Sequence, residues 1–100
     1  MSKVTITVTR GDRSESADIE RGDYTYLSDM QAEIEGPLFF SLGMEMEDRL
    51  EGVSLRLVST YPDAQMDASY DLTGDMEHSP ELDGVDTLLV GLLGLTNDVL

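Results

Sequence analysis

Residues 40–57 read FSLGMEMEDRLEGVSLRL and hold the clearest pattern in the chain. In the first half, apolar residues alternate with serine, glycine and glutamate, and a period of two is typical of a β-strand with one buried face. After a polar segment that ends at Gly52, the alternation resumes with Val53, Leu55 and Leu57. We therefore expect a β-hairpin here, with a dry face that the rest of the chain covers and a wet face open to solvent.

The composition fits one small globular domain with an unusual charge. The chain has 100 residues, of which 40% are hydrophobic, so it can form a single core and is not expected to be disordered. Twenty-one acidic residues face six basic ones, which gives a formal net charge of −15. Because affinity for phosphate backbones comes from Lys and Arg, this charge argues strongly against direct binding to nucleic acid and favours a basic protein partner.

Several classes of protein are disfavoured by what the sequence lacks. It has no cysteine, which rules out disulfides, thiolate nucleophiles and Cys-ligated metal centres. The first residues alternate like a strand and show no apolar core of a signal peptide. The longest uncharged run, residues 87–97, is too short to span a bilayer. We therefore expect a cytoplasmic protein without membrane contacts, in the host cytoplasm if a phage encodes it.

Three more segments alternate in the way that predicts β-strands, at residues 4–9, 14–20 and 66–72. The second of these is short and charged, which is typical of an edge strand. In the third, Asp67, Ser69 and Asp71 are expected to share the face that points to solvent.

Residues 24–35 predict a helix. Ser28 and Gln31 have the spacing of a capping box, and Gly36-Pro37 is a strong stop signal. The acidic side chains of this segment are expected to face solvent, namely those of Asp29, Glu33 and Glu35.

A second helix is predicted to begin at Ser79-Pro80-Glu81 and to continue into the apolar tail. For residues 88–93, a buried strand is the competing interpretation. The resulting order is β-β-α-β-β-β-α, an α+β fold in a single domain over 1–100. It predicts an antiparallel sheet of about five strands, with two helices covering its apolar face.

Catalysis and metal binding have few candidates in this sequence. His78 is the only histidine, and it lies in a polar segment where a solvated surface residue is expected. A calcium site would need oxygen ligands, and the segment 71–86 is rich in carboxylates, but the spacing of an EF-hand loop is missing. We therefore expect a protein that is not an enzyme and that has neither a cofactor nor a metal.

The positions of the acidic residues suggest a binding surface. Asp63, Asp67, Asp71 and Asp75 recur at every fourth position, and Glu45 and Glu47 fall on the wet face of the predicted hairpin. Strands lie roughly 4.8 Å apart and same-face residues roughly 6.6 Å apart, so carboxylates on neighbouring strands would form a phosphate-like array. The candidate partner-binding residues are therefore Glu45, Glu47, Asp63, Asp67, Asp71 and Asp75.

In composition and size, the chain resembles small phage-encoded anti-CRISPR and anti-restriction proteins. That resemblance implies an acidic inhibitor or nucleic-acid mimic that occupies the nucleic-acid groove of a basic protein, such as a nuclease or a CRISPR effector. An alternative is haloadaptation, in which the acidity reflects a cytoplasm rich in salt. In that case, acidic residues should be spread over every exposed face.

Overall fold

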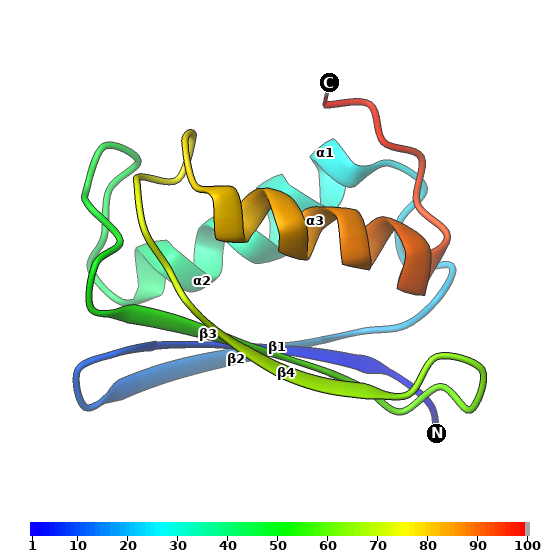
Figure 1. Ribbon diagram of the computed structural model, residues 1–100. Helices are drawn as coiled ribbons and strands as arrows, with labels where there is room; N and C mark the ends of the chain where they lie inside the picture. The colour runs from blue at the N-terminus through cyan, green and yellow to red at the C-terminus, as the bar shows by residue number, and fades with distance from the viewer. Residues whose placement is uncertain (100) are drawn as a thin grey trace.

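The computed structural model describes residues 1–99; Leu100, the last residue of the expected domain, lies outside the described residues. Figure 1 shows two layers, a twisted β-sheet and a layer of helices that covers one of its faces. The prediction of an α+β fold with an antiparallel sheet and helices on one face is confirmed. The helices form two stretches that lie side by side above the sheet.

Over residues 1–99, the sheet has four strands instead of the five that we expected. They are β1 (Val4–Arg10), β2 (Arg13–Ile19), β3 (Val53–Ser59) and β4 (Met66–Asp71). Their order across the sheet is β2-β1-β3-β4, and every neighbouring pair is antiparallel. The predicted edge strand at 14–20 is thus confirmed as β2, and β4 is the other edge.

The two faces of the sheet differ sharply in chemistry. The inward apolar residues of the two central strands are buried: Val4, Ile6, Val8, Val53, Leu55 and Leu57. The outward face carries mostly hydroxyl groups, and these bond across the strands, as in the pair Thr7–Ser16 at 2.9 Å. The alternation of the sequence therefore predicted which side chains enter the core.

The first helical stretch passes through the expected stop. It consists of α1 (Leu27–Met30), the π-helix η1 (Gln31–Glu35) and α2 (Gly36–Ser41), which follow one another without a break. A proline inside an α-helix clashes with the carbonyl four residues earlier. Here the backbone N–H of Gly36 instead bonds to the carbonyl of Gln31, and this wider turn directly before Pro37 gives the ring room.

Because the helix continues to Ser41, the predicted strand over residues 40–47 is wrong. Phe39, Leu42 and Met44 are buried, whereas Phe40 and Met46 are 48% and 41% exposed. The segment after Leu42 is a loop and has no strand pairing. The alternating pattern in this segment arose by chance, from the end of a helix followed by a loop. Only the second half of the predicted hairpin forms a strand, as β3.

Two arginines of the β1–β2 hairpin hold the end of α2 against the sheet. Arg10 Nη1 donates to the carbonyl of Leu42 at 2.9 Å, and Arg13 Nη2 donates to that of Ser41 at 2.8 Å. Carbonyls at a helix C-terminus lack intrahelical partners and carry partial negative charge, so cationic donors stabilise them.

The start of α1 is capped by the end of the chain and not by its own sequence. The predicted capping box is wrong, because Ser28 lies within the first turn, and its N–H donates to Asp98 Oδ1 at 3.0 Å. The preceding backbone also pairs with the tail, since the N–H of Leu27 donates to the carbonyl of Thr96.

The last helix, α3 (Pro80–Leu93), begins as predicted. Ser79 is its N-cap, and its side chain accepts a hydrogen bond from the N–H of Leu82. Residues 88–93 are helical, so the alternative of a buried strand is wrong. The helix ends at Gly94, which has a φ of +67°. Among the described residues, no helix has the length and apolar character needed to cross a bilayer.

Candidate functional site

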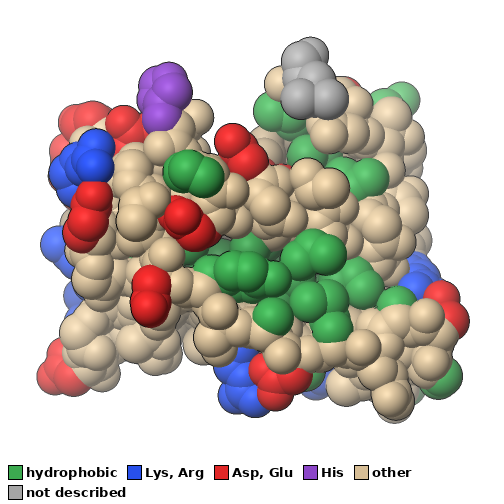
Figure 2. Space-filling model, in the orientation of Figure 1, with side chains coloured by type: hydrophobic (Ala, Val, Ile, Leu, Met, Phe, Trp, Pro, Cys, Tyr) green, Lys and Arg blue, Asp and Glu red, His purple; other side chains and the backbone are tan. Residues whose placement is uncertain are grey.

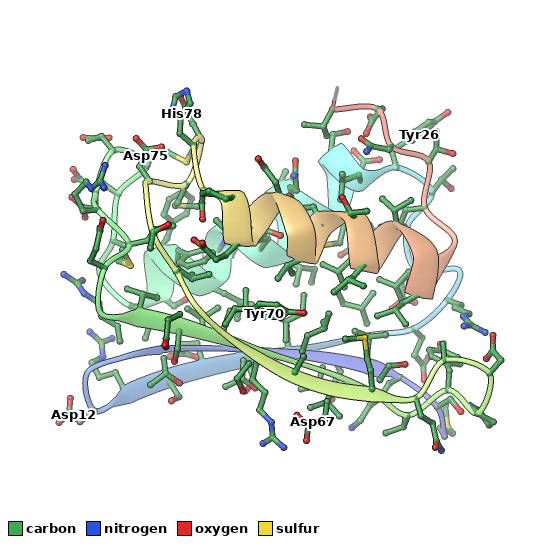
Figure 3. All side chains as sticks on the ribbon, viewed as in Figure 1. Asp12, Tyr26, Asp67, Tyr70, Asp75 and His78 are labelled. Atoms are coloured by element: carbon green, nitrogen blue, oxygen red, sulfur yellow. The ribbon has the colours of Figure 1, made fainter. Side chains whose placement is uncertain are left out.

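The predicted carboxylate array does not assemble on the sheet. Asp67 and Asp71 do lie on the outward face of β4, as expected, and Figure 3 shows Asp67 pointing away from the helices. Glu45 and Glu47, however, lie in the loop after α2, because the strand that should have carried them is absent. Asp63 precedes β4 and Asp75 follows it, so neither belongs to a strand.

Two of the six predicted residues are also neutralised by arginine. Arg21 makes a bidentate contact with Asp63, with both N–O distances at 3.0 Å, and its guanidinium lies 4.0 Å from the ring centre of Tyr61. Arg56 binds Asp67 in the same way, at 2.9 and 2.6 Å. Hydrogen bonds from these arginines lower the pKa of both carboxyl groups. The outward face of the sheet is therefore a poor phosphate mimic.

The negative charge is concentrated in the other layer. We call residues 27–51 and 72–99 the helix layer, and residues 1–26 and 52–71 the sheet layer. The helix layer has thirteen acidic residues and one base, Arg49, a net charge of −12; the sheet layer has eight acidic residues and five bases, a net charge of −3. Figure 2 shows acidic side chains gathered at the loop end of the helix layer, beside His78.

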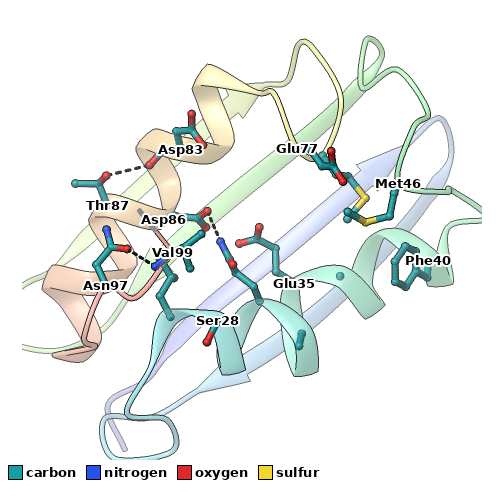
Figure 4. A pocket seen from close by; sticks show the side chains of 15 residues that line it. Ser28, Glu35, Phe40, Met46, Glu77, Asp83, Asp86, Thr87, Asn97 and Val99 are labelled. Carbon is teal, nitrogen blue, oxygen red and sulfur yellow. Dashed lines mark hydrogen bonds between the residues drawn. The ribbon is translucent and has the colours of Figure 1, made fainter.

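A groove runs between the two helical stretches in this layer (Figure 4). Its volume is about 850 Å³, which is within the range of ligand sites in proteins. Carboxylates and apolar side chains line it together, and the described lining residues include no lysine or arginine. The groove carboxylates are Glu35, Glu77, Asp83 and Asp86; the apolar lining includes Leu27, Phe40, Met46, Met76 and Val99.

Two of the predicted partner-binding residues lie beside this groove. Glu47 and Asp75 line a small adjoining cavity of about 110 Å³, whose other lining residues, Met46 and Glu77, also line the groove. Of the six predicted residues, the fold thus brings these two together.

The groove contains a pair of carboxyl groups that the sequence did not point to. Glu35 is only 7% exposed, although we expected it to face solvent. The wide turn of η1 changes the helical spacing just before Glu35, which turns this side chain inward toward Asp86 of α3 (Figure 4). In the sequence, the pair Gly36-Pro37 directly after Glu35 is the signal that could have indicated an irregular helical turn.

The two carboxyl groups of this pair share one proton. Burial and a hydrogen bond with Asp86 raise the pKa of Glu35 well above its usual value. Burial also raises the pKa of Asp86, while hydrogen bonds from Glu35 and Gln31 partly oppose that rise. Gln31 Nε2 lies 2.9 Å from Asp86 Oδ2. These directions indicate that Glu35 holds the proton and that Asp86 is the charged acceptor.

The single histidine does not form a nucleophilic site with its neighbours. His78 is exposed, as predicted, and its Nδ1 lies 3.2 Å from Asp75 Oδ1. The Ser79 hydroxyl instead accepts from Leu82 and lies 3.5 Å from Glu81, in its role as the cap of α3. Within residues 1–99, no three Asp, Glu or His side chains converge in a way that could hold a metal ion.

Comparison with protein-family models, with curated proteins and with solved structures finds no match to this chain.

Proposed function

We propose that this protein is an acidic binding module that blocks a basic nucleic-acid-binding protein, as an inhibitor of the anti-CRISPR or anti-restriction type. We propose further that it is not an enzyme and acts in the cytoplasm. The observation that supports this function is the charge asymmetry: the helix layer has a net charge of −12 and a single arginine. A surface of one sign attracts a basic groove at long range and competes with nucleic acid for it.

We assign the proposed contact surface to the helix layer instead of the sheet. Of the residues predicted from sequence, Glu45, Glu47 and Asp75 belong to this layer, whereas Asp63 and Asp67 are engaged by arginines of the sheet layer. The hydroxyl-rich outward face of the sheet is left as solvated surface. The proposed contact thus consists of the groove, its rim and the adjoining loops.

Two variants with equal changes of charge test this assignment. The helix-layer variant carries Glu45→Lys, Glu47→Lys and Asp83→Lys, and the sheet-layer variant carries Asp12→Lys, Glu15→Lys and Asp71→Lys; all six residues are exposed. Binding to a panel of purified nucleases and CRISPR effectors is measured at several salt concentrations, with DNA as competitor. We expect the helix-layer variant to bind more weakly and with a flatter salt dependence, and the sheet-layer variant to stay close to the parent.

The alternative of haloadaptation predicts a different response. Thermal unfolding is compared at low salt and in molar potassium chloride. A protein kept acidic for a partner should fold cooperatively at low salt, whereas a haloadapted protein should fold only at high salt. If the two charge variants bind the panel equally, or if no basic protein is bound, the proposed function is wrong.

A further inference from the structure

The lining of the groove includes two buried carboxyl oxygen atoms that lack a hydrogen-bond donor. Within the described part of the chain, Glu35 Oε2 and Asp86 Oδ1 have no hydrogen-bond partner. They come from η1 and α3, which form opposite sides of the groove (Figure 4). Burying carboxyl groups without donors is costly, so the site requires either a proton or a cation between them.

The surroundings of the pair favour a cation that has an apolar stem. Glu77 and Asp83 line the same groove and add negative charge, and none of the described residues that line it is basic. Phe40 and Met46 offer exposed apolar surface along the groove. An arginine side chain combines a planar, permanently charged fork with a hydrophobic stem and stacks well on aromatic rings.

We propose that the Glu35–Asp86 pair is the anchor site for an arginine side chain of the basic partner, with its guanidinium between the two carboxylates and its stem against Phe40 and Met46. This inference rests on the proposed function, and it specifies arginine as the residue type of the partner that the groove binds. In the free protein, Glu35 carries the proton that the pair shares. Arginine does not give up its own proton at neutral pH, so the proton of Glu35 leaves to solvent as the guanidinium enters.

Proton release distinguishes this site from general electrostatic attraction. The probe is a short helical peptide with arginines and leucines on one face, and its control has citrulline, which is neutral, in place of each arginine. Calorimetry at neutral pH in two buffers of different ionisation enthalpy measures both affinity and protons released. For the parent protein, we expect binding with release of about one proton, and much weaker binding of the citrulline peptide.

Glu35→Gln removes the proton that is exchanged but keeps a donor toward Asp86, so we expect this variant to fold. Its affinity for the arginine peptide should fall roughly tenfold or more, without proton release. Glu33→Gln makes the same chemical change two residues away on an exposed site of η1, and should bind within about twofold of the parent. Asp86→Asn is a second, independent variant and should also weaken binding.

The outcomes separate the anchor site from the proposed function. If Glu35→Gln and Asp86→Asn bind the peptide like the parent, while the helix-layer charge variant binds weakly, the anchor is refuted and the acidic surface stands. If free arginine amide binds with proton release but the peptide does not, the groove takes a small molecule and the docking inference is overturned. If the parent binds neither probe, the anchor and the acidic surface both fail.

Discussion

Glu35→Gln should change how the stability of the free protein depends on pH. The raised pKa of Glu35 in the folded state means that the folded protein holds this proton more tightly than the unfolded chain does. Stability from this group is fully present below the unfolded pKa, about 4.3, and is lost as pH rises toward the folded pKa. Glutamine does not titrate, so the variant avoids this loss.

The size of the effect follows from one proton at a side chain that is 7% exposed. One extra bound proton corresponds to a slope of about 1.4 kcal/mol per pH unit in the free energy of unfolding. The difference between variant and parent should therefore grow by that amount for each pH unit above about 4.3, until the folded pKa is reached. Carboxyl groups that do not contact Glu35 titrate alike in both proteins, so their contributions cancel in this difference.

Urea unfolding at constant ionic strength, over a series of pH values, measures this difference directly. Glu33→Gln is the matched control, because it makes the same substitution in η1 at an exposed position. For this control we expect no such divergence from the parent, because the side chain of Glu33 is exposed. If Glu35→Gln gives a line parallel to the parent at every pH, Glu35 is ionised in the folded state, and the shared-proton arrangement is refuted.

Three further predictions test the fold around the site. Gly74→Ala should destabilise the protein by about 2 kcal/mol or more in urea unfolding. Gly74 has a φ of +77°, and a Cβ there would lie 1.9 Å from the carbonyl oxygen of His78. Gly91 in α3 has open space around it, so Gly91→Ala should instead stabilise the protein by up to about 1 kcal/mol. Leu89→Ala should cost about 2–5 kcal/mol because Leu89 is fully buried, whereas Leu88→Ala, at a 37% exposed position, should cost less than about 1 kcal/mol; equal effects would contradict the orientation of α3. Asp98→Ala should speed hydrogen exchange of the amides of α1, whose first turn it caps, and unchanged exchange would show that the tail does not hold this helix.

Local patterns predicted the elements whose pairing partners lie close in sequence or whose faces are uniform. The alternation of β1 and β3 placed their inward apolar side chains in the core, and Ser79-Pro80 marked the start of α3. The same logic failed over residues 40–47, because a period of two over a few residues also arises by chance. No residue pattern in that segment indicated that the preceding helix would continue through Pro37.

The candidate site was predicted in its charge but not in its place. The excess of acid followed from composition. The array on the sheet failed because Glu45 and Glu47 are not on a strand, and because Arg21 and Arg56 reach Asp63 and Asp67. These ion pairs depend on strand register and on the path of loops, which residue spacing alone does not determine.

The sequence by itself determined a small acidic α+β domain, the inward faces of its central strands and the start of its last helix. These properties depend on composition and on short-range periodicity, which act before any distant segments meet. Only the tertiary structure decided that the charge gathers on the helix layer and that a buried carboxyl pair lies in its groove. Glu35 and Asp86 are far apart in the chain, and they meet because a π-turn redirects one helix while α3 packs beside it. Such a juxtaposition is a property of packing between elements, so no local pattern contains it.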